Sequence, residues 1–90
     1  MTYKIEFKNK ADEDFLKIDG NLRKFFSKHL EKVATMPPRR HLKHGLPFFV
    51  EEVTKQARLV YELEDETQTL FVVRCFALHK DYEKWYQSFK

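Results

Sequence analysis

Residues 58–86 read RLVYELEDETQTLFVVRCFALHKDYEKWY, and this stretch decides the fold. Two apolar segments, 58–63 and 69–76, have the composition of strands and flank an acidic turn. A run rich in His, Lys and Tyr follows the second segment. Strands provide a rigid platform, and these polar side chains can bind phosphate and transfer protons. The combination predicts chemistry on a nucleic-acid backbone.

The other elements are assigned outward from this hairpin. Residues 2–8 alternate between polar and apolar, which predicts a half-buried strand. Asn9 is expected to cap a short helix, and apolar residues at helical spacing predict a longer helix over 21–34. Residues 48–53 resume strand character, and 81–88 are predicted to form a short helix or an extended tail.

The predicted fold class is α+β, with the element order β-α-α-β-β-β in a single domain over residues 1–90. Short turns between the last three strands predict an antiparallel sheet, with the two N-terminal helices packed on one face. The other face, which carries Arg58, is expected to stay open. Such a one-sided sandwich with an exposed basic face is a suitable platform for a single RNA strand.

Composition and charge restrict the class of protein. The net charge is +3, which favours an anionic partner only weakly. The single cysteine, Cys75, excludes an internal disulfide, fits a reducing cytoplasm and is predicted to be a buried, inert thiol. No apolar run has the length of a signal peptide or a membrane span. We therefore expect a cytoplasmic protein with no membrane partner.

Two phrases and the C-terminal run together resemble a known family. They are HLKHGLP at 41–47, RLVY at 58–61, and a basic tail that ends in tyrosine. In this order they are similar to the RelE/ParE superfamily of toxins from type II toxin–antitoxin systems, and most similar to its RelE and YoeB branches.

The resemblance implies a toxin that cleaves mRNA in the ribosomal A site and needs no metal or other cofactor. The RNA 2′-hydroxyl attacks the adjacent phosphorus, which leaves a 2′,3′-cyclic phosphate and a 5′-hydroxyl. The implied partners are mRNA and a cognate antitoxin that blocks the active face, in a homodimer or a toxin–antitoxin hetero-oligomer. Two alternatives stay open: a ParE-like inhibitor of DNA gyrase, and an inactive member that only binds its antitoxin.

The resemblance also implies the residues of the site. Arg58 matches the strand arginine that binds phosphate, His79 matches a C-terminal histidine that transfers protons, and Tyr86 matches the tail tyrosine. Tyr82 is an alternative to Tyr86. Tyr82 is also a candidate for binding RNA or phosphate, together with Lys43, Lys55, Arg74 and Lys80.

The chain departs from the family pattern at the general base. RelE carries two lysines on the strand before the arginine, whereas residues 49–53 read FVEEV, and YoeB has a glutamate where this chain has two arginines. Glu51 or Glu52 is a candidate base, with His79 as the alternative. The missing lysines favour the alternative of a ParE-like gyrase inhibitor, whereas the tail with His79 argues against that alternative. The four histidines show no metal-ligand spacing, so no metal site is expected.

Overall fold

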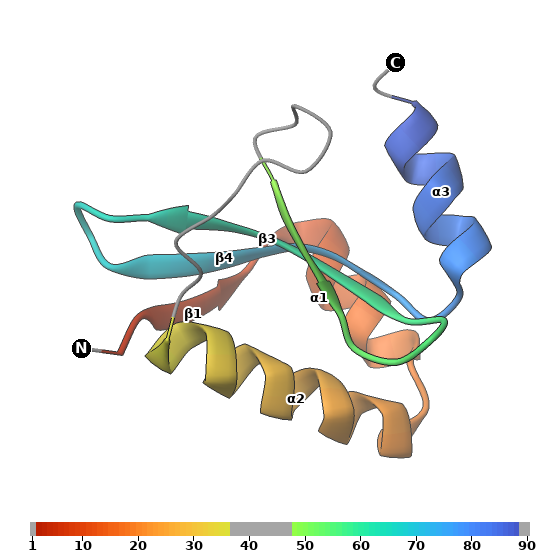
Figure 1. Ribbon diagram of the computed structural model, residues 1–90, viewed down its shortest axis with the longest axis horizontal. Coiled ribbons are helices and arrows are strands. Elements are labelled where there is room, and N and C mark those ends of the chain that lie inside the picture. Colours follow the sequence, from red (N-terminus) through yellow and green to blue (C-terminus); the bar gives the residue numbers. More distant parts are fainter. Residues whose placement is uncertain (1, 37–47, 89–90) are drawn as a thin grey trace.

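The fold is that of a computed structural model, which describes residues 2–36 and 48–88. The predicted loop with Lys43 lies outside the described residues. Four strands and three helices follow one another along the chain (Figure 1). They are β1 (Lys4–Phe7), α1 (Asn9–Lys17), α2 (Gly20–Thr35), β2 (Phe49–Glu52), β3 (Arg58–Glu64), β4 (Thr69–Phe76) and α3 (His79–Gln87).

The four strands form one sheet in the order β1-β4-β3-β2. Strands β2, β3 and β4 pair antiparallel, which confirms the predicted meander. Strand β1 pairs parallel to β4, so the prediction of a purely antiparallel sheet is wrong. Local patterns reveal antiparallel pairing through short turns, but β1 and β4 are joined by a long connection that leaves their relative direction open.

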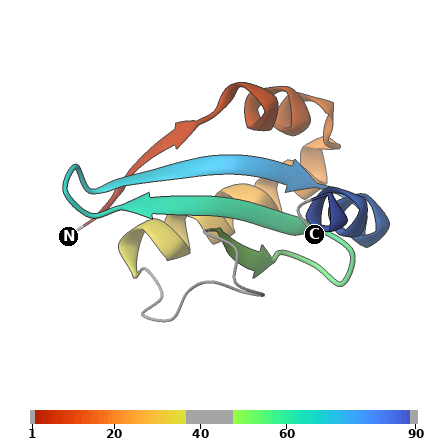
Figure 2. The same cartoon turned by 90° about the horizontal axis from the view of Figure 1, so that it is seen from above.

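Helices α1 and α2 pack on the same face of the sheet, as predicted. Figure 2 shows α2 crossing behind the strands, with α1 beside the edge formed by β1. Their apolar side chains and the inward side chains of β3 and β4 form one core cluster. Its fully or almost fully buried members include Ala11, Phe26, Leu59, Tyr61, Leu70 and Val72.

The opposite face of the sheet is only partly open, because α3 covers one end of it (Figures 1 and 2). A second apolar cluster joins Val60 and Phe76 of the strands to Tyr82 of α3, with Trp85 and Tyr86 packed against it. The spacing of these three α3 residues makes one helical stripe, so their burial accounts for the helix. The expectation of a fully uncovered face is therefore wrong at this end.

The start of α1 differs from the sequence prediction. Lys8, whose side chain makes no capping bond, is the N-cap of α1, and Asn9 is already helical. The predicted Asn9 cap is therefore wrong. The N-cap of α2 is Asp19, whose carboxylate accepts a hydrogen bond from the backbone N–H of Asn21 at 3.0 Å.

A β-bulge in β4 changes the face on which later side chains lie. Val60 is paired with Arg74 and Tyr61 with Val72, so Val73 is the extra residue between them. Directly paired residues share a face, which places Arg74 with Val60 on the side of α3. In residues 2–36 and 48–88, no helix is long and apolar enough to cross a membrane.

Candidate active site

The turn between β2 and β3 is held together by Arg58. Its Nη1 donates to the backbone carbonyls of Thr54, Lys55 and Ala57 at 3.0, 3.1 and 3.0 Å. The Thr54 hydroxyl accepts hydrogen bonds from the N–H groups of Gln56 and Ala57. The hydrogen bonds of Nη1 therefore stabilise the turn, and the same bonds hold the guanidinium in one orientation.

The other edge of Arg58 remains available for an anion. Nη2 lies 3.8 Å from Oε2 of Glu52, a loose ion pair, and the Arg58 side chain is 14% exposed whereas that of Glu52 is 64% exposed. Because Glu52 pairs with Arg58 in the β2–β3 register, the two side chains lie on the same face. The arrangement offers a preorganised cation beside an accessible carboxylate.

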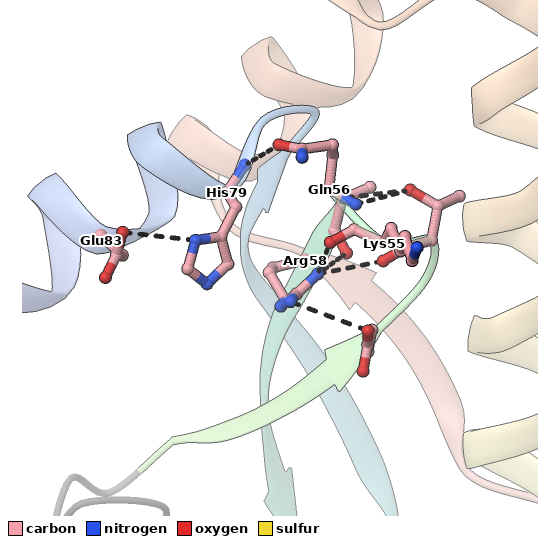
Figure 3. Close-up of polar contacts among 8 residues, drawn as sticks. Lys55, Gln56, Arg58, His79 and Glu83 are labelled. Atoms are coloured by element: carbon pink, nitrogen blue, oxygen red, sulfur yellow. Dashed lines mark hydrogen bonds and ion pairs between the residues drawn. The ribbon is translucent and has the colours of Figure 1, made fainter.

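His79 is the first residue of α3, and two residues orient it (Figure 3). Its backbone N–H donates to Oε1 of Gln56 at 3.3 Å, which ties the start of the helix to the Arg58 turn. Its Nδ1 lies 3.3 Å from Oε1 of Glu83, one helical turn away. With Nδ1 engaged by this carboxylate, Nε2 is the ring nitrogen available for proton transfer.

Aromatic rings of α3 connect His79 to the sheet. The ring centroids of His79 and Tyr82 are 5.8 Å apart, and Tyr82 and Tyr86 stack at 6.2 Å. Burial and the neighbouring Tyr86 raise the pKa of Tyr82, while the positive charge of Arg58 opposes that rise. Tyr82 is therefore the phenol close to Arg58, and Tyr86 lies one turn further along the helix.

Glu51, a candidate base, lies on the other face of the sheet. It is paired with the core residue Leu59, and its Oε2 accepts from Nδ1 of His29 at 2.8 Å and Nζ of Lys32 at 2.7 Å, both on α2. Burial raises the pKa of Glu51, but these two hydrogen bonds outweigh that effect and hold it below its usual value. The geometry separates Glu51 from Arg58 and leaves Glu52 as the carboxylate on the side of His79.

Arg74 is held by an acidic residue of α1. Its Nε and Nη2 donate to the two carboxylate oxygens of Asp14 at 2.6 and 3.1 Å, and its guanidinium lies 4.9 Å from the ring centre of Phe76. Asp14 also accepts the backbone N–H of Cys75. The Cys75 thiol is buried, as predicted, and burial raises its pKa to about 12.

The remaining lysine candidates are distributed around this centre. Lys55 is exposed on the Arg58 turn, and Lys80 is exposed in the first turn of α3, next to His79. Lys43 lies outside the described residues. Within residues 2–36 and 48–88, no group of three or more His, Cys, Asp and Glu side chains is arranged to hold a metal ion.

Sequence reasoning missed two residues that build the site, Gln56 and Glu83. The spacing of Glu83 from His79, four residues along a predicted helix, was a usable signal for the second. No local pattern identifies Gln56, because its partner is distant in sequence and the bond depends on how α3 docks.

Solved structures of similar fold give the chain a family context. The E. coli RelBE toxin–antitoxin complex contains a chain that is 26% identical, with a TM-score of 0.73, over 81% of this chain and 93% of that one. A metal-bound toxin from Helicobacter pylori is 28% identical, with a TM-score of 0.69, over 90% and 98%. The Staphylococcus aureus YoeB dimer shares the fold at 20% identity and a TM-score of 0.68, over 83% and 95%.

No protein-family model and no curated protein sequence matches the chain. The likeness to the solved toxins nevertheless extends over most of each chain. The chain has the fold of the RelE and YoeB toxins of toxin–antitoxin systems, and this likeness supports the resemblance to the RelE/ParE superfamily.

Proposed function

We propose that this chain is the toxin of a type II toxin–antitoxin module and cleaves mRNA in the ribosomal A site. The observation that carries the proposal is the joining of the Arg58 turn to the start of α3, with Glu52, Arg58 and His79 on the same side of the sheet. These three groups meet the three demands of attack by a 2′-hydroxyl: a base, an acid and a cation.

In the proposed reaction, Glu52 accepts the proton of the RNA 2′-hydroxyl. The 2′-oxygen then bonds to the adjacent phosphorus, and the bond from phosphorus to the 5′-oxygen breaks. His79 donates a proton from Nε2 to that leaving oxygen. The products are a 2′,3′-cyclic phosphate and a 5′-hydroxyl, and no metal takes part.

Arg58 stabilises the charge that develops on the phosphoryl oxygens. Its Nη1 is already engaged by three carbonyls, so the guanidinium is fixed before RNA arrives and loses little freedom on binding. Nη2 and Nε form the edge that approaches phosphate. Glu83 orients the imidazole of His79 through its contact with Nδ1.

The proposal includes the ribosome and an antitoxin as partners. A single carboxylate and a single imidazole are few groups for efficient cutting of free RNA, so we expect the ribosome to orient the strand for in-line attack. The E. coli toxin of similar fold was solved in complex with its antitoxin, which supports a comparable protein partner here. The proposed site of action is the cytoplasm, where the ribosomes are.

The test is cleavage of a defined mRNA by the purified protein with and without programmed ribosomes. We expect cutting only with ribosomes, a loss of at least about 100-fold for His79→Ala, and restored growth of cells that express this variant. Lys28→Ala, at an exposed position of α2, is the matched control and should cut normally. Rapid degradation of naked RNA, or full cleavage by folded His79→Ala, contradicts the proposal. Growth arrest without cut mRNA, accompanied by inhibited gyrase, supports the ParE-like alternative.

A further inference from the structure

A hollow beside α3 is not used by the reaction proposed above. It has a volume of about 400 Å³ and lies between the start of α1, strand β4 and the second half of α3. No acidic residue is among the described residues that line it. The lining side chains that matter here are Lys8, Lys10, Phe48, Val73, Arg74 and Trp85.

The three cationic side chains that line this hollow differ in whether a carboxylate pairs with them. Arg74 is held by Asp14, and Lys8 lies 3.1 Å from a carboxylate oxygen of Glu62. Lys10 is exposed, and no carboxylate in the described part of the chain pairs with it. The hollow therefore has one uncompensated positive charge and two cations fixed in place, which favours an anionic ligand.

The aromatic side of the hollow is formed by Phe48 and Trp85, whose rings are tilted by 48° to each other, and the face of a single aromatic ring is a surface on which a base stacks. The ring centroids of Phe48 and Trp85 are 5.4 Å apart, and Trp85 is 5.7 Å from Phe76 beneath it. Both Phe48 and Trp85 are only partly buried. Aromatic rings beside cations are the usual means of binding single-stranded nucleic acid without reading its sequence.

The hollow and the candidate active site both border α3, the hollow at Trp85 and the site at His79. Trp85 follows His79 by six residues, which corresponds to about 9 Å along a helix. A stacked strand advances about 3.4 Å per nucleotide, so this length spans two to three nucleotides. The ring centroids of Tyr82 and Trp85, which lie on this length of the helix, are 6.5 Å apart.

We propose that this hollow binds a nucleotide two to three positions from the cleaved phosphate. Its base lies against Trp85 and Phe48, and its phosphate lies near Lys8, Lys10 and Arg74. The inference rests on the proposed function, since it assumes an RNA strand that passes His79. An acidic peptide is the competing occupant, and the experiment below separates the two.

Trp85 is the only tryptophan of the chain, so its fluorescence reports directly on the hollow. The probe is a short single-stranded 2′-O-methyl oligoribonucleotide, which the protein cannot cleave because its 2′-oxygens carry no proton. We expect it to quench Trp85, and we expect hexanucleotides to bind more tightly than dinucleotides. A short acidic amphipathic peptide is titrated in parallel.

Two substitutions test the two halves of the hollow. Lys10→Ala should weaken binding for every sequence and lower the slope of log K against log salt concentration by about one, whereas Lys28→Ala should leave both unchanged. With a labelled oligonucleotide, Trp85→Leu should lose about 5- to 100-fold in affinity, and Trp85→Phe should recover most of it.

The outcomes also separate this inference from the proposed function. Equal binding by Lys10→Ala and Lys28→Ala overturns the subsite, whatever the cleavage result. Quenching of Trp85 by the acidic peptide and not by RNA overturns it as well. RNA-dependent quenching together with the expected variant effects supports the subsite even if ribosome-bound mRNA stays intact, and in that case only the nuclease proposal falls.

Discussion

Replacement of Arg58 is expected to damage stability and catalysis by different amounts, because the two edges of its guanidinium do different things. Nη1 has two hydrogens for three carbonyls, at 3.0 to 3.1 Å, which corresponds to roughly two full hydrogen bonds from a charged donor. At about 1.5 kcal/mol each, Arg58→Ala should lower the free energy of unfolding by about 3 kcal/mol. Arg58→Lys retains a charged donor for the turn, so it should lose only about 1–2 kcal/mol.

The cleavage rates of these two variants should not follow the order of their stabilities. Lysine cannot bind a phosphate with two parallel N–H groups while it also holds the turn, so Arg58→Lys should cleave at least about 100-fold more slowly although it folds. Urea unfolding gives the stability, and cleavage of ribosome-bound mRNA gives the rate, with Arg23→Lys on α2 as the control. The reasoning is refuted if Arg58→Ala is as stable as the wild type, or if folded Arg58→Lys cleaves at the wild-type rate.

Further predictions concern the site and its neighbours. Glu52→Gln should lower the cleavage rate by about 100-fold or more, whereas Glu51→Gln should cleave normally, and the reverse result would move the base to the helix side. Glu51→Gln should instead lose about 1–2 kcal/mol of stability at neutral pH. The pKa of Glu51 is lower in the folded than in the unfolded protein, so Glu51 contributes to the free energy of unfolding above its unfolded pKa. This contribution disappears as the pH falls through the folded pKa, and urea unfolding at several pH values measures the loss. Gln56→Ala should cost about 1 kcal/mol and speed hydrogen exchange at the His79 amide, and unchanged exchange would contradict the capping contact. Asp14→Asn should cost about 2–4 kcal/mol in urea unfolding, because it leaves Arg74 half-buried without its charged partner; a loss below about 0.5 kcal/mol would show that the pair is not stabilising. Protein treated with EDTA and then desalted should cut ribosome-bound mRNA as fast as untreated protein, and activity restored only by added zinc would revive a metal mechanism.

The hairpin at the centre of the fold was predictable from local pattern. The predicted strand 69–76 coincides with β4, and the predicted strand over 58–63 differs from β3 by one residue at its end. Alternation and an acidic turn are local signals, so they locate such strands well. The parallel pairing of β1 depends on how a long connection folds, which no local pattern contains.

The candidate site was predictable in its residue types and less so in its geometry. Adjacent strand residues point to opposite faces, so the choice between Glu51 and Glu52 depended on the pairing of β2 with β3. The side of the sheet on which Arg74 lies depended on the bulge at Val73, and no pattern in the sequence predicts that bulge. Distant contacts decided these points, whereas the character of Arg58 and His79 was visible in the residues themselves.

The chemistry of the cut ends tests most directly whether Glu52, Arg58 and His79 form one catalytic centre. Ribosome-bound mRNA is incubated with the protein, and the termini of the fragments are identified by mass spectrometry. The proposed reaction predicts a 2′,3′-cyclic phosphate on one fragment and a 5′-hydroxyl on the other, with neither formed by His79→Ala. Fragments with a 5′-phosphate, or identical yields from wild type and His79→Ala, would contradict it.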